Sequence, residues 1–421
     1  MRFPRMAHVK QSFVGPALGD LEYEVNQQFE QSWLTPEISP GMRIAVAVGS
    51  RGIANLSAIV RMVCYEIQAL GATPFIIPAM GSHGGATAEG QTAVLRSLGI
   101  TEKLCGAPII SSMDVVQIGA TWNQIPVYMD KQAWNSDGVV LVNRIKPHTD
   151  FHSGRGFESG LLKMSVIGLG KDRQAEVLHG YGVKGLVDFL PEVADVVLGT
   201  GKVLGGVAIV ENAREETAII EVLHYGQITD REPILLKKAI GLMPGLPVKD
   251  LDVLLVDQIG KDFSGTGMDT NIIGRIGILG SQEPKSPRIK YIIASDLTEA
   301  SHGNALGIGL ADFTTRRLFE KIDFDVMNAN VLTSSFIRRG MIPLVLDNTK
   351  ECLQAALRCN WGVSTEKARL IRIPNTLHLE HIYVSEALLP EIRTMPYIEV
   401  IQEGIDLEFD HDGYLTPFRG V

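Results

Sequence analysis

The sequence predicts an α/β protein of two domains, each with a Rossmann-like, mainly parallel sheet, facing one another across an interdomain cleft. Short apolar runs alternate with longer stretches of helical period, and a βαβα order favours a parallel sheet covered on both faces. The chain has 421 residues, 45% of them hydrophobic, which is enough for more than one core. Its 43 glycines suit many tight turns between strands and helices.

The first domain begins with alternating strands and helices. Arg43 opens a β-rich apolar run that Gly49 ends, which is typical of a buried parallel strand. The following stretch carries apolar residues at helical spacing and is closed by Gly71. The predicted strands are 43–48, 73–78 and 138–143, and the predicted helices are 55–70 and 87–98, the latter capped by Thr87.

A second unit of the same kind begins near residue 250. The segment 243–249 (MPGLPVK) contains two prolines and a glycine and is the best candidate linker. We therefore expect an N-terminal domain over 1–246 with the cofactor and catalytic residues, and a C-terminal domain over 247–421 that completes the substrate site. Its predicted strands are 252–256 and 289–294, its predicted helices 314–322 and 350–360, and Asn328 and Asn330 are expected at a strand end.

Charge and cysteine content exclude several classes of protein. Lysine and arginine total 39 against 48 acids, and a net charge of -9 argues against binding nucleic acid or an anionic membrane. The four cysteines form no CxxC pair, and neither a secretory signal nor a membrane-spanning run is visible. We expect a cytoplasmic protein.

Unusual residues follow the predicted strands. The turn Ser50-Arg51-Gly52 is either a plain glycine-rich turn or an anion site, and it is not a dinucleotide fingerprint because GxGxxG is missing. His83 lies in GSHGG, where it either caps a helix or performs acid–base chemistry.

The segment 143–179 is the richest in ionisable groups. It contains His148, Asp150, His152, Arg155, Glu158, Lys163, Lys171 and His179. The run 158–170 reads as an apolar helix, and an amine within it either snorkels or loses its proton and becomes a nucleophile. The alternatives are a charged surface loop and a zinc site, and zinc is disfavoured because no ligand pair has the usual spacing.

The chain resembles the nickel-pincer-dependent lactate racemase family, including its 2-hydroxyacid racemase and epimerase relatives. The resemblance rests on an ordered set of residues in both predicted domains. These are Arg51, the GSH histidine His83, Pro147-His148, Ser159-Gly160-x-x-Lys163, His179 sixteen residues later, and the Q-x-x-K pair Gln258 and Lys261.

The resemblance implies a cofactor and a role for each matching residue. A pyridinium-3,5-bisthiocarboxylate mononucleotide would be covalently linked to Lys163, and its nickel ion would be bound by His179. His83 and His148 would be the two acid–base groups, and Arg51, Gln258 and Lys261 would bind the substrate. Ser264, from the polar loop after Lys261, is a further candidate substrate ligand. Ser50, Gly52, Ser159 and Gly160 would complete the cofactor site. The implied reaction is inversion of C2 of a 2-hydroxy acid by reversible hydride transfer.

The sequence departs from the family pattern in three places. The stretch before Lys163 is longer and adds His152, which is an alternative to His148 as the second base. Gly84 stands where the lactate enzymes carry an arginine, which argues against specificity for lactate. The polar loop 261–271 is either an ordinary turn with an Asx cap or a set of ligands for a substrate larger or more polar than lactate.

Two other functions stay open. One is another reaction of hydroxy acids, such as dehydration or oxidoreduction, and the other is a non-catalytic protein that binds sugar acids or nucleotides. The expected partners are a hydroxy-acid substrate and, transiently, the enzymes that build the cofactor. The oligomeric state is left open, with a homodimer as one option.

Overall fold

The computed structural model describes residues 2–154 and 156–418, so Arg155 lies outside the described residues. The chain forms two compact units. The first, Val14–Met243, is here called the five-stranded unit, and the second, Met1–Phe13 with Pro244–Val421, the eight-stranded unit.

The sheet of the five-stranded unit has the order β3-β2-β6-β7-β8, parallel except for β8. Both faces are buried: Ile44 and Val46 contact one apolar cluster, and Ala45 and Ala47 the other. Its strands are β2 (Arg43–Val48), β3 (Thr73–Pro78), β6 (Gly138–Arg144), β7 (Val203–Glu211) and β8 (Thr217–His224), and a separate hairpin is formed by β4 (Val115–Ala120) and β5 (Pro126–Asp130).

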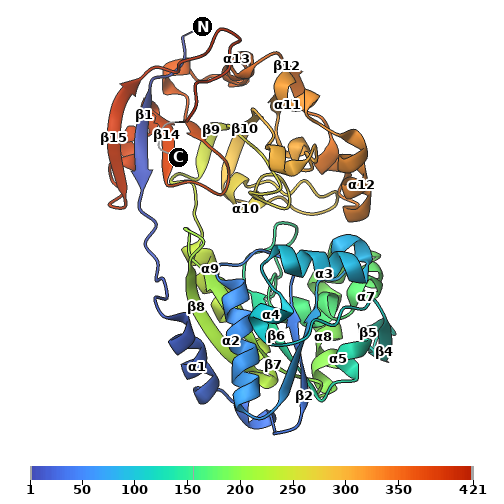
Figure 1. Cartoon of the computed structure of the whole chain (residues 1–421). Helices are drawn as coiled ribbons and strands as arrows, with labels where there is room; N and C mark the ends of the chain where they lie inside the picture. Colours follow the sequence, from blue (N-terminus) through green and yellow to red (C-terminus); the bar gives the residue numbers. More distant parts are fainter. Residues whose placement is uncertain (1, 155, 419–421) are drawn as a thin grey trace. The chain divides into compact units, whose positions relative to one another are not determined.

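Helices cover the two faces of this sheet (Figure 1). α1 (Leu21–Gln31) and α2 (Leu56–Ala69) pack on one face, and α8 (Leu190–Gly199) and α9 (Tyr225–Leu242) pack on the other. The unit also contains α3 (Ala88–Ser97), α4 (Glu102–Cys105), α5 (Lys131–Trp134), α6 (Leu161–Lys163) and α7 (Lys171–His179).

The eight-stranded sheet has the order β12-β11-β10-β9-β13-β14-β1-β15. The first five strands of this order are parallel and the last three are antiparallel to their neighbours. The strands are β1 (Met6–Gln11), β9 (Asp250–Val256), β10 (Arg288–Ala294), β11 (Phe313–Thr315), β12 (Leu344–Leu346), β13 (Leu370–Ile373), β14 (His381–Ser385) and β15 (Ile398–Ile405). The helices are α10 (Thr270–Ile273), α11 (Arg316–Glu320), α12 (Phe324–Ser334), α13 (Thr349–Cys359) and α14 (Leu389–Ile392).

The predicted α/β class and mainly parallel sheets are confirmed, and several boundaries differ. The expected helix 158–170 begins at Leu161, and Met164–Gly168 is π-helical. The expected helix 314–322 is split between β11 and α11, and Asn330 lies in α12 rather than at a strand end. Residues 1–13, which the prediction placed in the N-terminal domain, belong to the eight-stranded unit because β1 pairs with β14 and β15.

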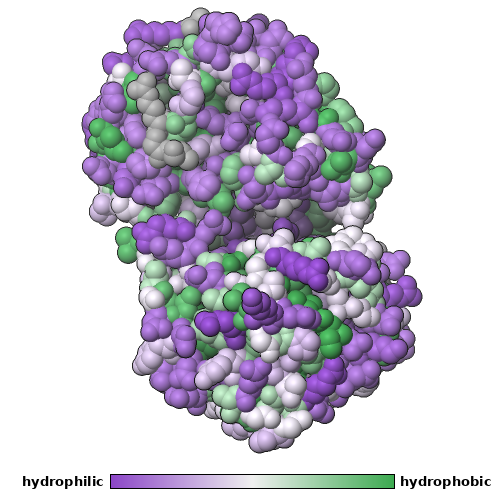
Figure 2. Space-filling view, viewed as in Figure 1, coloured by the Kyte–Doolittle hydropathy of each residue, from purple (hydrophilic) through white to green (hydrophobic). Residues whose placement is uncertain are grey.

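The face of the protein shown in Figure 2 mixes hydrophilic residues with scattered apolar ones. Scattered exposed apolar residues are normal for a folded chain. Within the described residues, every helix is either too short or too polar to cross a membrane.

Candidate functional site

The carboxyl ends of β2 and β6 lie next to each other at a reversal of strand order. From β2 the chain continues to β3 on one side, whereas β6 pairs with β2 on the other side. Ligands of open α/β sheets bind at such a switch point. Arg51 follows β2, His83 follows β3 and His148 follows β6, so the sheet carries these three predicted residues at one edge.

The loops after β2 and β3 are joined by a hydrogen bond between Ser50 Oγ and His83 Nδ1. Gln91 of α3, which is fully buried, holds the loop that carries His83 in place. Its amide group donates to the carbonyl oxygens of Gly81 (2.8 Å) and His83 (3.2 Å). His83 is partly exposed to solvent, and its backbone is fixed by these two hydrogen bonds.

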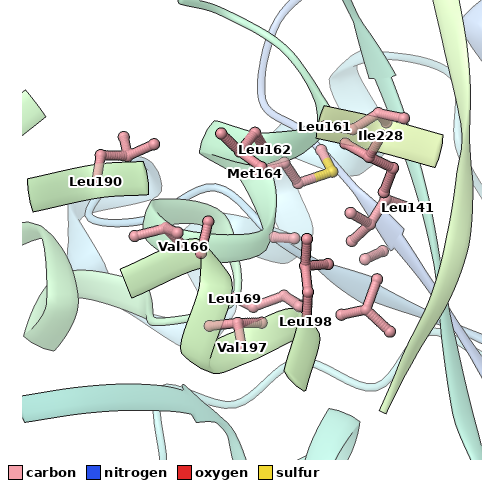
Figure 3. Packing of buried hydrophobic residues seen from close by; sticks show 14 of the residues in the cluster. Leu141, Leu161, Leu162, Met164, Val166, Leu169, Leu190, Val197, Leu198 and Ile228 are labelled. Atoms are coloured by element: carbon pink, nitrogen blue, oxygen red, sulfur yellow. The ribbon is translucent and has the colours of Figure 1, made fainter. Parts of the chain in front are cut away.

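Lys163 lies at the end of α6, in the apolar surround that the sequence predicted. Leu161 and Leu162 pack into the same cluster as Leu141 and Ile228, as Figure 3 shows. The helix continues as the π-helical turn Met164–Gly168, and π-helical insertions are frequent at functional sites.

The hydrogen bonds of His148 indicate the protonation state of Lys163. The amide N–H of Asp150 donates to Nδ1 of His148 (3.0 Å), so a neutral imidazole carries its proton on Nε2. Nε2 is hydrogen-bonded to Nζ of Lys163. An N–H group can donate only to an amine with a free lone pair, so this contact forms with the neutral, nucleophilic form of Lys163.

The electrostatic environment of Lys163 makes this neutral form accessible, and the rest of the amine is charged at pH 7. Burial lowers the pKa of its amine to about 8, and the positive charge of Arg51 lowers it further, whereas the carboxylates of Asp150 and Glu158 raise it. The ring of Phe151 lies 5.7 Å from Nζ and stacks on His148, with 4.6 Å between ring centroids.

Two further histidines lie within electrostatic reach of Lys163. Desolvation lowers the pKa of His83 to about 4, and the charges of Arg51 and Lys163 act in the same direction. Desolvation and then Lys163 also lower the pKa of His179, which ends α7, while Asp150 opposes the shift. Both imidazoles are therefore neutral near pH 7, the form that accepts a proton or binds a metal.

His148 and His152 occupy different environments although both bond to Glu158. The backbone N–H of His148 donates to Oε2 of this buried carboxylate (2.7 Å), and Nδ1 of His152 lies 3.2 Å from Oε1. The side chain of His152 is 47% exposed, whereas that of His148 is 16% exposed and contacts Lys163.

The other predicted cofactor residues have different surroundings. Ser159 pairs through its backbone with Lys146, at 2.9 and 3.2 Å. Gly52 is exposed, and Gly160 lies against the buried carboxyl group of Glu232. Among the described residues, no group of three or more His, Cys, Asp or Glu side chains is placed to hold a metal ion.

The predicted substrate residues of the eight-stranded unit lie on the loop after β9. Gln258 has an exposed side chain, and Nζ of Lys261 donates to Asn330 Oδ1 (2.8 Å) and the carbonyl oxygen of Gly265 (2.7 Å). Ser264 Oγ lies 3.0 Å from the hydroxyl group of Thr266.

Polar side chains of this loop form hydrogen bonds with residues of the same unit. Asp269 caps α10 by accepting from the amide of Asn271 (2.9 Å), which is the Asx cap of the simpler interpretation. Asp262 accepts from the hydroxyl group of Thr298 (2.6 Å). These contacts remove much of the sequence argument for a polar substrate.

Sequence reasoning placed Lys171 in the ionisable cluster and overlooked Glu232. Lys171 is instead fully buried, with Nζ 3.0 Å from Oδ2 of Asp130. The sequence around Lys171 does not show that this lysine is buried. The sequence around Glu232 does not show that its carboxyl group contacts a helix 70 residues away.

Comparison with known proteins agrees with the fold. The family of lactate racemase N-terminal domains matches residues 24–184. The lactate racemase apoprotein from Thermoanaerobacterium thermosaccharolyticum superposes with a TM-score of 0.53 at 11% identity, over 88% of this chain and 98% of that chain. A protein of known structure from Thermotoga maritima gives a TM-score of 0.47 at 12% identity, over 84% and 96% of the two chains. No curated protein matches.

The fold and the matched region define a lactate racemase-like α/β protein. Residues 24–184, which match the lactate racemase N-terminal domain, include Arg51, His83, His148, Lys163 and His179. The resemblance noted from the sequence is thereby confirmed.

Proposed function

We propose that this protein is a racemase or epimerase that inverts C2 of a 2-hydroxy acid. The observation that carries the proposal is the contact between Lys163 and His148, which holds an amine of lowered pKa in a desolvated position at the switch point of the sheet. A desolvated amine whose neutral form is accessible is suited to covalent attachment. The match of this region to the lactate racemase N-terminal domain supports the same function.

The residues present fit a nickel-pincer nucleotide. Lys163 offers an amine whose lowered pKa makes its neutral form accessible for the covalent bond, and His179 offers an imidazole whose lowered pKa keeps it available to a metal. Ser50, Gly52, Ser159 and Gly160 are the proposed contacts of the nucleotide. When bound, the group would supply a reversible hydride acceptor for the C2 hydrogen.

Two imidazoles can share the proton transfers. Inversion at C2 needs a neutral imidazole that takes the proton of the hydroxyl group on one face and a protonated imidazole that returns a proton on the other face. We assign His83 and His148 to these roles and Arg51 to the substrate carboxylate. An acylated Nζ has no lone pair to accept from His148, so attachment at Lys163 would release that imidazole.

His148 is favoured over His152 as the second base. His152 is paired with the carboxylate of Glu158 and its side chain is half exposed, whereas His148 contacts the attachment point itself. Gln258, Lys261 and Ser264 remain proposed substrate ligands. A substrate larger or more polar than lactate also remains a proposal.

The test is co-expression with enzymes that build the cofactor, followed by intact-protein mass spectrometry, nickel analysis and chiral chromatography of 2-hydroxy acids. We expect added mass on the peptide that contains Lys163 and racemisation of a 2-hydroxy acid. We also expect about one nickel ion per chain, because the proposed site has a single imidazole ligand. Lys163→Ala should lose the added mass, whereas His83→Ala should keep it and lose turnover. Wild-type turnover by Lys163→Ala would refute the mechanism, and tight ligand binding without turnover by the loaded protein would favour a binding function.

A further inference from the structure

Glu232 of α9 is a buried carboxyl group at the start of the helix that carries Lys163. Its side chain is 1% exposed, and Oε2 accepts a hydrogen bond from the amide of Leu162 (2.9 Å), with the amide of Leu161 as a second donor. Gly160, at the N-cap position, has no side chain that could do this. Glu232 therefore supplies, from 70 residues away, the cap that this helix lacks.

The chain before Lys163 approaches α9 at two glycines. A Cβ atom on Gly160 would lie 2.3 Å from Oε1 of Glu232, and a Cβ atom on Gly156 would lie 2.7 Å from Cβ of Pro233. Gly160 has extended backbone with φ of -177°, so it is the carboxyl group, and not the backbone conformation, that excludes a side chain there. Two successive residues of α9 thus fix both ends of the segment 156–160.

This carboxyl group is in a costly position. Burial raises the pKa of Glu232 to about 7, although the amides of Leu162 and Leu161 lower it. Oε1 is buried and has no hydrogen-bond partner among the described residues. A buried polar atom without a partner costs about 1–3 kcal/mol, so its presence calls for a compensating role.

We propose that Glu232 is a positioning residue that caps the turn carrying Lys163 and thereby holds its amine in the desolvated position against His148. The inference rests on the proposed function only in taking Lys163 as the reactive residue. Glu232 acts through the amides of Leu161 and Leu162 and touches no reacting atom.

The experiment measures the pH profile of Lys163 acetylation by acetic anhydride in the full-length chain without cofactor, read by peptide mass spectrometry. Glu232→Ala should let water reach the amine and raise its labelling midpoint, and a shift of one pKa unit would slow labelling at pH 7 about tenfold. Glu232→Gln keeps a carbonyl acceptor for the two amides and should label within about threefold of wild type.

A second perturbation reaches the same contact from the other side. Gly160→Ala places a methyl group where the carboxyl group lies, so it should displace the cap and shift the midpoint in the same direction. Since both changes break one contact, the double variant should shift no further than Glu232→Ala alone. Gly160→Ala and Glu232→Gln also keep the test decisive if Glu232→Ala fails to fold.

Leu235→Ala is the matched control, because Leu235 is a fully buried residue of the same helix that is not part of the cap. It should lower the thermal stability and leave the labelling midpoint unchanged. An unchanged midpoint in Glu232→Ala and Gly160→Ala, or an equal shift in Leu235→Ala, would overturn the proposal. Because no cofactor or substrate is used, this result is independent of whether the loaded protein racemises hydroxy acids.

Discussion

Replacing Lys171 by methionine tests the buried ion pair beneath the candidate site. Nζ of Lys171 lies 3.0 Å from Asp130 Oδ2 and donates to Gln91 Oε1 (3.2 Å) and to the carbonyl oxygen of Pro78. Lys171 and Asp130 are both fully buried, and burial lowers the pKa of the lysine while Asp130 opposes the shift. Methionine keeps the length of the side chain but leaves the carboxylate without its cation.

The expected loss is large for a single substitution. Removing one partner of a buried ion pair costs about 3–5 kcal/mol, because the remaining charge is left uncompensated. A unit of this size loses about 2–4 °C of melting temperature per kcal/mol, so we expect a fall of roughly 6–20 °C. Adding Asp130→Asn should recover much of the loss, because asparagine is neutral. Its side-chain carbonyl can still cap α5 by accepting hydrogen bonds from the amides of Gln132 and Ala133.

Calorimetry measures the loss, and hydrogen exchange followed by mass spectrometry assigns the transition to the five-stranded unit. Lys202→Met is the matched control: Lys202 is half-buried in the same unit, and its Nζ donates to the carbonyl oxygen of Ser136 (2.8 Å). It should cost only about 1 kcal/mol. A loss of similar size in Lys171→Met, or no recovery in the double variant, would refute the reasoning.

Three further outcomes follow from the charges around the site. Arg51→Met removes a positive charge that lowers the pKa of His83 and of Lys163. The pKa of both groups should therefore rise, measured by NMR for His83 and by amine labelling for Lys163. If both titration midpoints are unchanged, the electrostatic account is wrong. In the wild type, His83 should remain neutral until well below pH 6.5, and a saturating 2-hydroxy acid should raise its midpoint; titration at 6.5 without ligand would disagree. In the cofactor-loaded protein, His148→Ala should lose at least about 100-fold in kcat whereas His152→Ala should lose much less, and the reverse order would exchange their roles.

The local sequence was sufficient to predict the parallel core of each unit. Strands buried on both faces read as continuous apolar runs, and the runs at 43–48 and 73–78 match β2 and β3 in full. Thr87 caps α3 as expected, because an N-cap interacts with amides only a few residues away. The turns that carry Arg51, His83 and His148 were found for the same reason, since they follow those strands.

Features that depend on distant pairing were beyond this reasoning. β1 joins a sheet whose other strands begin some 240 residues later. Asn330 was predicted at a strand end but lies in a helix, because the apolar residues around it fit the spacing of a helix as well as that of a strand. Glu232 looks like any acidic residue of a helix until its carboxyl group is seen against Gly160. The hydrogen bond that favours the neutral form of Lys163 likewise depends on a backbone amide, which fixes the tautomer of His148.

An anionic substrate can offset the positive charge that lowers the pKa of His83 in the empty site. Arg51 and Lys163 lower the pKa of His83, so in the empty site this imidazole is a weak base. A 2-hydroxy acid bound through its carboxylate to Arg51 would bring a negative charge that offsets this guanidinium and raises the pKa of His83 towards the working pH. General bases act best when their pKa lies near that pH. An anionic substrate would thus strengthen the base that acts on it, and a neutral alcohol of the same shape would not.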